Sequence, residues 1–143
     1  MIILKKKYFL LIEDIKDIKL SNLKLINKFI IIYRNQNKYC NFNKLLEFRR
    51  ICKVKKIDFY ISNDTKLMKS LNADGLYISA YNTSLQLSRY RNSKYNIIGS
   101  AHNRRDLSLK TAQGCSYIIF SRLFKVKDPN KRGFLGVIKF NHY

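Results

Sequence analysis

Short apolar runs alternate with polar and charged segments along most of the chain, and these runs predict its strands. Each run has the length of a buried strand, and most are separated by segments long enough for a helix. The predicted strands lie near Tyr8–Ile12, Phe29–Tyr33, Phe59–Ile61, Gly75–Ile78, Asn96–Gly99 and Tyr117–Phe120. The run Phe29–Tyr33 is apolar throughout, which is typical of a strand buried on both faces of a parallel sheet.

The segments between these runs carry helix signals. Ile15–Lys28 can hold one short helix, and Asn43 can cap a helix that extends to about Lys55. Further helices are predicted over Thr65–Leu71 and Ser84–Arg91. Strands that alternate with helices predict a parallel α/β sheet, because each parallel connection needs a crossover.

The stretch from Asn96 to Phe124 shows this unit most clearly. A strand that stops at Gly99 precedes a short polar turn, a helix capped by Asn103 and ended by Gly114, and a second strand. We expect one helical face to carry Leu107, Leu109 and Ala112. Loops at the C-terminal ends of parallel strands carry chemistry, so the polar residues just past these strands are site candidates. These residues are Ser100, His102, Ser121 and Arg122.

The same stretch resembles a known family. GSAHN, the QG turn and YIIFSRLF resemble the G-V-S-x-H…G-A-D-Y-V-x-x-G-x-V/I-F pattern of the thiamine-phosphate synthase and thiazole tautomerase family. Two further segments match in order, YFLLIED near the start and FYISNDTKLMKSLNADGLYIS in the middle. The resemblance covers the chain from Tyr8 to about Val137 and implies a TIM-barrel-like fold.

A closed barrel of this kind has eight βα units and typically ~250 residues. The 143 residues of this chain carry about six predicted units. We therefore expect one domain over residues 1–143, with an incomplete TIM-barrel-like (β/α) parallel sheet. Its open edges, Tyr8–Ile12 and Tyr117–Phe120, are apolar and predict a homodimer or a completing partner chain.

The resemblance implies a pyrophosphate site at two strand ends. Asn63 and Asp64 match the family's N-D pair, which binds pyrophosphate and metal, so Asp64 is the expected Mg²⁺ ligand. Alternatively, Asp64 caps the following helix. Arg34 matches an arginine that serves the pyrimidine pyrophosphate, although a structural role is also open. The family's second metal-ligand carboxylate is replaced by Asn82, which should weaken a metal site.

Two residues of the S-x-H motif are the catalytic candidates. Ser100 matches a serine that contacts substrate in the synthases. His102 matches a histidine implicated in proton transfer in the tautomerase branch, and imidazole titrates near physiological pH. The alternative is a turn histidine that bonds to backbone. After the last strand, the family's G-P-I-F-x-T-x-T-K loop is replaced by a basic loop, in which Lys125, Lys127 and Lys131 can hold an anion.

Composition narrows the function classes. The net charge of +20 attracts nucleic acid and phosphorylated ligands, but the lysines are scattered and no RNA-binding aromatic motif is present, so nucleic-acid binding is not expected. The alternative explanation of the positive charge is compositional drift, because Lys, Ile and Asn are abundant throughout the chain. Cys40, Cys52 and Cys115 lack the spacing of a zinc site. No apolar run approaches the ~20 residues of a membrane span, and the expected location is the cytoplasm.

The sequence therefore predicts a thiamine-phosphate synthase-like transferase of thiamine biosynthesis. The resemblance implies that it joins hydroxymethylpyrimidine pyrophosphate to thiazole phosphate and releases pyrophosphate, with reduced activity. The first alternative is a thiazole tautomerase-like proton shuttle, which needs no metal. The second is a noncatalytic protein that binds phosphorylated ligands, or a subunit completed by another chain.

Overall fold

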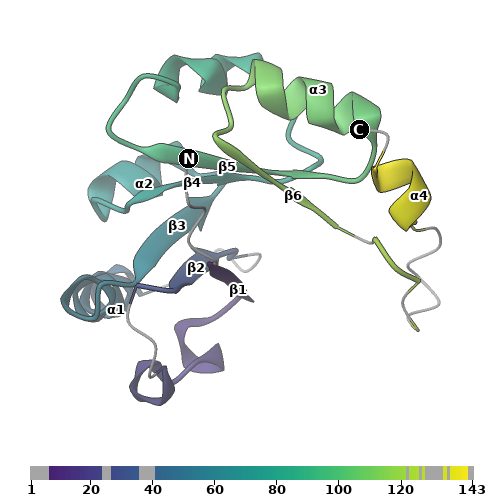
Figure 1. Ribbon diagram of the computed structural model, residues 1–143. Coiled ribbons are helices and arrows are strands. Elements are labelled where there is room, and N and C mark those ends of the chain that lie inside the picture. The colour runs from purple at the N-terminus through teal and green to yellow at the C-terminus, as the bar shows by residue number, and fades with distance from the viewer. Residues whose placement is uncertain are drawn as a thin grey trace. The chain divides into compact units, whose positions relative to one another are not determined.

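The computed structural model describes residues 7–23, 27–35, 41–121, 123–125, 127, 134 and 136–141. Strands and helices alternate along most of the chain (Figure 1). With η for a 3-10 helix, the elements are β1 (Tyr8–Ile12), η1 (Ile15–Asp17), η2 (Leu20–Asn22), β2 (Phe29–Tyr33), α1 (Phe42–Val54), β3 (Asp58–Ser62), α2 (Thr65–Ser70), β4 (Gly75–Ile78), η3 (Leu85–Tyr90), β5 (Asn96–Ala101), α3 (Arg104–Ala112), β6 (Tyr117–Phe120) and α4 (Val137–Phe140). They fall in two compact units, residues 1–77 and 78–143.

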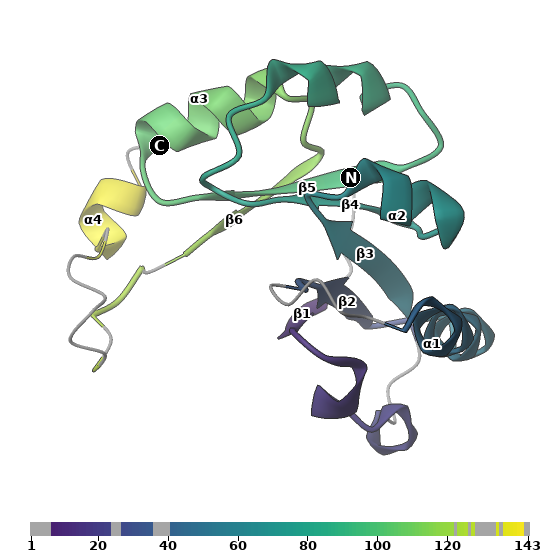
Figure 2. The same ribbon diagram turned by 180° about the vertical axis from the view of Figure 1, so that it is seen from behind.

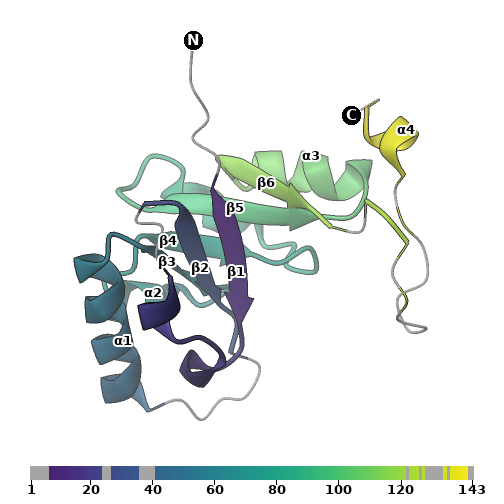
Figure 3. The same ribbon diagram turned by 60° about the horizontal axis from the view of Figure 1, so that its bottom comes forward.

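The strands follow the same order in the sheet as in the chain, from β1 to β6. In the first unit, β1 to β4 pair in parallel, with Ile12 opposite Tyr33 and Tyr33 opposite Ile61. Figure 3 shows β1 and β2 side by side. In the second unit, β5 and β6 pair in parallel, with Ala101 opposite Phe120. The predicted parallel α/β arrangement is therefore confirmed.

Helices cover the central strand of the first unit. Both α1 and α2 contact β3, as Figures 1 and 2 show from opposite sides. Leu45 of α1, Met68 of α2 and Phe59 of β3 are fully buried, and the Phe48 and Phe59 rings meet edge to face at 5.7 Å between centroids. In the second unit, α3 packs on β5. Apolar side chains thus bury the face of each sheet segment that its helices cover.

The prediction of one short helix over Ile15–Lys28 is wrong in the described part of that segment. Two separate 3-10 helices, η1 and η2, occur instead. The carboxylate of Asp17 accepts the backbone N–H groups of Glu13 and Asp14 at 2.9 and 2.8 Å, which closes a tight turn directly after β1. The chain then becomes extended at Ile18, where φ is −138° and ψ is 132°, so no α-helix propagates.

Two other helix predictions need correction. The cap of α1 is Asn41 rather than Asn43, because the Asn41 side chain accepts the N–H groups of Asn43 and Lys44. The segment predicted as a helix over Ser84–Arg91 is a 3-10 helix rather than an α-helix, over Leu85–Tyr90. By contrast, Asn103 caps α3 as predicted, and Gly114 follows its end with a φ of +83°.

Strand β5 does not stop at Gly99 but continues to Ala101. A Cβ atom at Gly99 would lie 2.8 Å from Cys115 Sγ and 3.0 Å from two side-chain carbons of Lys110. Gly99 therefore leaves space for the side chains of Cys115 and Lys110, and it does not form a turn. The predicted apolar face of α3 is also wrong, because Ala112 is exposed.

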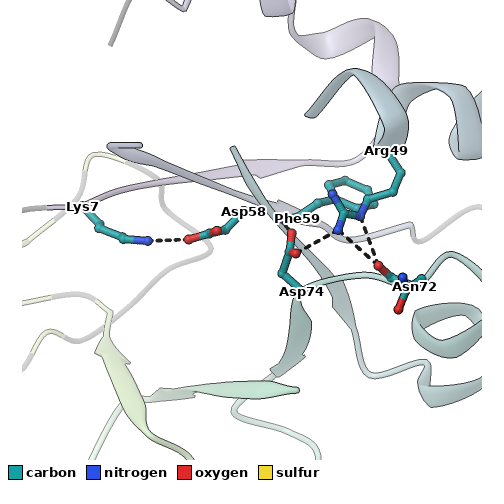
Figure 4. A network of polar contacts seen from close by, with 6 residues as sticks. All are labelled: Lys7, Arg49, Asp58, Phe59, Asn72 and Asp74. Atoms are coloured by element: carbon teal, nitrogen blue, oxygen red, sulfur yellow. Dashed lines mark hydrogen bonds and ion pairs between the residues drawn. The ribbon is translucent and has the colours of Figure 1, made fainter. Parts of the chain in front are cut away.

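Arg49 lies buried in a polar network of the first unit (Figure 4). Its guanidinium donates to Asp74 Oδ1 at 2.8 Å and to the backbone oxygen of Asn72 at 3.1 and 3.3 Å. Asp74 Oδ2 in turn accepts the N–H of Phe59 at 2.7 Å. Lys7 pairs with Asp58 at the start of the same strand, β3. These contacts tie α1 to the N-terminal end of β3, away from the strand ends that carry the candidate site residues.

Cys52 and Cys115 are free thiols, whereas Cys40 lies outside the described residues. Burial raises the pKa of Cys52 to about 12 and that of Cys115 to about 11. Both therefore remain protonated near neutral pH, as expected for packing residues. In the described part of the chain, no helix is both long and apolar enough to cross a membrane.

Candidate functional site

Residues that follow three consecutive strands meet at His102 in the second unit. His102 follows β5, and Ser121 follows β6 directly. Because Ala101 and Phe120 are register partners, the next residues of the two strands are neighbours, and Ser121 Oγ lies 2.7 Å from His102 Nδ1. Tyr81, beyond the end of β4, places its ring centroid 6.1 Å from that of His102. Tyr81 is 80% exposed, so this cluster opens to solvent.

The backbone of His102 is held by the start of α3. Asp106 Oδ2 accepts the His102 N–H at 3.0 Å, while the Asn103 side chain accepts the Asp106 N–H at 2.9 Å. This reciprocal arrangement is a variant of the capping box, and it suits the positive end of the helix dipole. The Asp106 carboxylate therefore fixes the turn, and the partner of the imidazole ring is Ser121.

Ser100 occupies a different environment from the one its sequence position indicated. It lies inside β5, opposite Ile119, and is only 5% exposed. The predicted contact between Ser100 and substrate stays a prediction.

Three predicted residues follow strands at one edge of the sheet in the first unit, namely Arg34, Asn63 and Asp64. Arg34 directly follows β2 and is half-buried, with its N–H bonded to Ile12 O at 2.8 Å. Asn63 directly follows β3, has a φ of +58° and donates its backbone N–H to Tyr77 O at 2.8 Å. Because Tyr33 and Ile61 are register partners, Arg34 and Asn63 lie at the ends of adjacent parallel strands.

Asp64 caps α2, since its Oδ1 accepts the N–H of Leu67 at 2.9 Å. The alternative that Asp64 caps the helix is therefore correct. The capping bond uses only one oxygen of the exposed carboxylate, so metal binding by Asp64 stays a prediction. Asp64 and Arg34 lie in the first unit, whereas Ser100 and His102 lie in the second.

A cleft of about 980 Å³ also opens at the strand ends of the first unit. It is bordered by residues that follow β1 and β2 and by the start of α1. Its lining is Leu11, Glu13, Asp14, Ile15, Lys16, Asp17, Tyr33, Asn35, Asn41 and Lys44. Hydrogen bonds from the N–H groups of Asp14 and Glu13 lower the pKa of Asp17. The acidic lining was not predicted, although the segment IEDIKD at a strand end carries a signal for it.

The position of the family's second metal carboxylate does not fit a metal ion. The side chain of Asn82 accepts the N–H of Ser84 at 3.0 Å. Its backbone oxygen accepts both Lys110 Nζ at 2.7 Å and Gln113 Nε2 at 2.9 Å. Lys110 and Gln113 are fully buried, so the Lys110 ammonium already places a positive charge beside the Asn82 backbone. Burial lowers the pKa of Lys110, and the negative charge of the Asp106 carboxylate offsets only part of this effect. Among the described residues, no group of three or more His, Cys, Asp or Glu side chains could hold a metal.

The basic loop after β6 is described only in part. Lys125 and Lys127 are exposed, as expected of side chains that could meet an anion. Arg122 and Lys131 lie outside the described residues. The predicted substrate-binding role of Lys125 and Lys127 stays a prediction.

Comparison with known proteins assigns the family. A family model described as thiamine monophosphate synthase matches residues 19–142. The chain belongs to this family. The thiamine-phosphate synthase of Pelagibacter ubique is 34% identical over 109 residues, which are 71% of this chain and 52% of that protein. A thiamine-phosphate synthase of Prochlorococcus marinus is 29% identical over 96 residues, which are 66% of this chain and 28% of that protein. The chain thus spans about half, or less, of these synthases.

A solved structure supports the fold. The thiamine phosphate pyrophosphorylase from Pyrococcus furiosus aligns with a TM-score of 0.57 at 12% identity, covering 80% of this chain and 55% of that one. At this identity the likeness concerns the fold alone. Together with the parallel strands, it confirms the predicted TIM-barrel-like α/β fold, and the described residues form six of the eight strands of a closed barrel.

Proposed function

We propose that this member of the thiamine monophosphate synthase family acts in thiamine biosynthesis as a synthase-type transferase. It would join hydroxymethylpyrimidine pyrophosphate to thiazole phosphate and release pyrophosphate. The geometric observation that supports this best is the common strand edge of Arg34 and Asn63. In a parallel sheet, that edge is where the loops that bind ligands lie.

The residues at this edge suit a leaving group that carries several negative charges. Such a transfer depends on stabilising the charge of the departing pyrophosphate more than on a protein nucleophile. The Arg34 guanidinium can pair with phosphate oxygens, and the exposed Asn63 side chain follows the adjacent strand. In the second unit, the exposed side chains of Lys125 and Lys127 are separate candidates for binding a phosphorylated ligand.

Magnesium would bind weakly, through Asp64. The Asp64 carboxylate is exposed and keeps one oxygen outside its helix-capping bond, so it fits as a single oxygen ligand. When bound, Mg²⁺ supplies charge neutralisation to the pyrophosphate oxygens. Asn82 adds no ligand, because its side-chain oxygen and its backbone oxygen already accept hydrogen bonds.

We further propose that the active form is a homodimer or a complex with a completing chain. The first and last strands of the sheet expose large apolar side chains, with Tyr8, Leu11 and Tyr117 at least half exposed. Static light scattering on the purified chain measures the assembly state. The cytoplasmic location stays a prediction.

The test of the proposed function is pyrophosphate release from both substrates, with and without added Mg²⁺. Asp64→Asn is the informative variant, because asparagine also caps helices and so preserves α2. We expect slow turnover that Mg²⁺ increases, and loss of that increase in Asp64→Asn. Glu47→Gln, an exposed change on α1, is the matched control and should behave as wild type. A folded chain that releases no pyrophosphate under any condition would instead support the noncatalytic alternative.

A further inference from the structure

The contacts of His102 bear on which of its ring nitrogens carries the proton. Ser121 Oγ lies 2.7 Å from Nδ1, which is the usual length for a hydroxyl donor and the short end of the range for an N–H donor. The backbone oxygen of Ser121 lies 3.4 Å away, beyond the usual range for an N–H donor. Within the described residues, no hydrogen bond reaches Nε2. The geometry therefore favours a neutral imidazole that accepts at Nδ1 and carries its proton on Nε2.

We propose that Ser121 is a positioning residue that holds His102 as an Nε2–H donor, and that this donor serves an anionic oxygen of a phosphate-bearing ligand. The proposal rests on the synthase function proposed above. The surroundings of His102 allow a ligand to reach it, since His102 is half-buried and the neighbouring ring of Tyr81 is exposed. Ser121 occupies the position of a glycine in the family pattern, and a glycine has no hydroxyl group that could contact the histidine.

This arrangement separates the two enzyme functions. A proton-shuttling tautomerase needs a nitrogen that can accept a proton from its ligand. In His102, Nε2 already carries its proton, and Nδ1 is turned to the Ser121 hydroxyl. The residue is thus suited to bind an oxyanion rather than to abstract a proton, which favours the transferase.

The tautomer is measurable by long-range ¹H–¹⁵N correlation in a chain labelled with ¹⁵N-histidine. His142→Gln assigns the signals, because the chain has two histidines. In the neutral imidazole form, we expect His102 of the wild type to be almost wholly the Nε2–H tautomer. Ser121→Ala should increase the Nδ1–H form, whereas Ser121→Thr, which keeps the hydroxyl, and the exposed control Ser116→Ala should not. A wild-type chain with its proton on Nδ1 would overturn the assignment.

The ligand is tested with inorganic pyrophosphate at fixed ionic strength, because the net charge of +20 attracts any anion. We expect pyrophosphate to shift the Nε2 resonance of His102, and His102→Ala to weaken about ten-fold the binding detected at the backbone amide resonance of Ser121. His102→Gln, whose amide can place an N–H near Nε2, should retain most of the affinity. Equal binding by wild type and His102→Ala, with no change at Nε2, would refute the donor role. The synthase function is tested separately, by pyrophosphate release from the two substrates, so the two proposals can fail independently.

Discussion

Replacing Asp74 by asparagine should destabilise the first unit because it leaves a buried guanidinium without its counter-charge. The Arg49 side chain is 8% exposed and that of Asp74 is 34% exposed, with 2.8 Å between Nη2 and Oδ1. Removing one partner of a buried ion pair costs about 3–5 kcal/mol. Because Asp74 is one-third exposed, we expect the lower end, a loss of about 3 kcal/mol in the free energy of unfolding.

The converse change should cost less. Arg49→Met removes the buried charge and keeps an apolar side chain, while Asp74 still accepts the N–H of Phe59 and contacts water. We expect a loss of about 1 kcal/mol for Arg49→Met and about 2 kcal/mol for the double variant, which is less than the sum of about 4 kcal/mol for the single changes. The difference would measure the coupling of the pair.

Urea denaturation of the four proteins of this cycle provides the measurement. Arg50→Met is the matched control on the same helix, because its side chain is 70% exposed and lies 3.6 Å from Glu47. Exposed pairs of this kind contribute about 0–1 kcal/mol, so Arg50→Met should change stability little. Strictly additive losses in the cycle, or equal losses for Arg49→Met and Arg50→Met, would refute the reasoning.

Three further changes test local features of the structure. Gly114→Ala should lower the free energy of unfolding by about 2 kcal/mol, because φ is +83° and the new Cβ would lie 2.9 Å from Arg91 Cβ; unchanged thermal stability would contradict this. Asn103→Ala should cost about 1 kcal/mol in urea denaturation, and Asn103→Asp should not, because aspartate also caps. Burial raises the pKa of Cys52 from 9.0 to about 12, so its stabilising contribution is complete below pH 9 and is lost as the pH rises toward 12. The decrease in stability over that range should be smaller in Cys52→Ala, and an identical pH dependence would contradict the burial.

The strands could be predicted because their signal is local. β-branched and aromatic runs such as Phe29–Tyr33 identify a buried strand, and the structure has that strand at the predicted residues. Asn103 and Gly114 likewise carry their cap and stop signals in the residue type itself. The helix predicted within Ile15–Lys28 failed because a side-chain bond of Asp17 closes a tight turn, which apolar spacing does not indicate.

The buried polar groups could not be predicted from periodicity. A pattern of apolar positions assigns lysine and arginine to the surface, whereas Lys110 and Arg49 are buried because each finds backbone oxygens and a side-chain partner. The His102–Ser121 pair was not predicted for a different reason. Both residues were recognised at strand ends, but their contact depends on the register of β5 and β6.

The most direct test of the central claim is a single-turnover assay that detects thiamine phosphate as the product. The purified chain, in excess over hydroxymethylpyrimidine pyrophosphate and with thiazole phosphate present, should form thiamine phosphate together with one equivalent of pyrophosphate. The rate should be slow and should increase with Mg²⁺. A folded chain that binds pyrophosphate but forms no thiamine phosphate would contradict the synthase assignment and leave a noncatalytic ligand-binding protein.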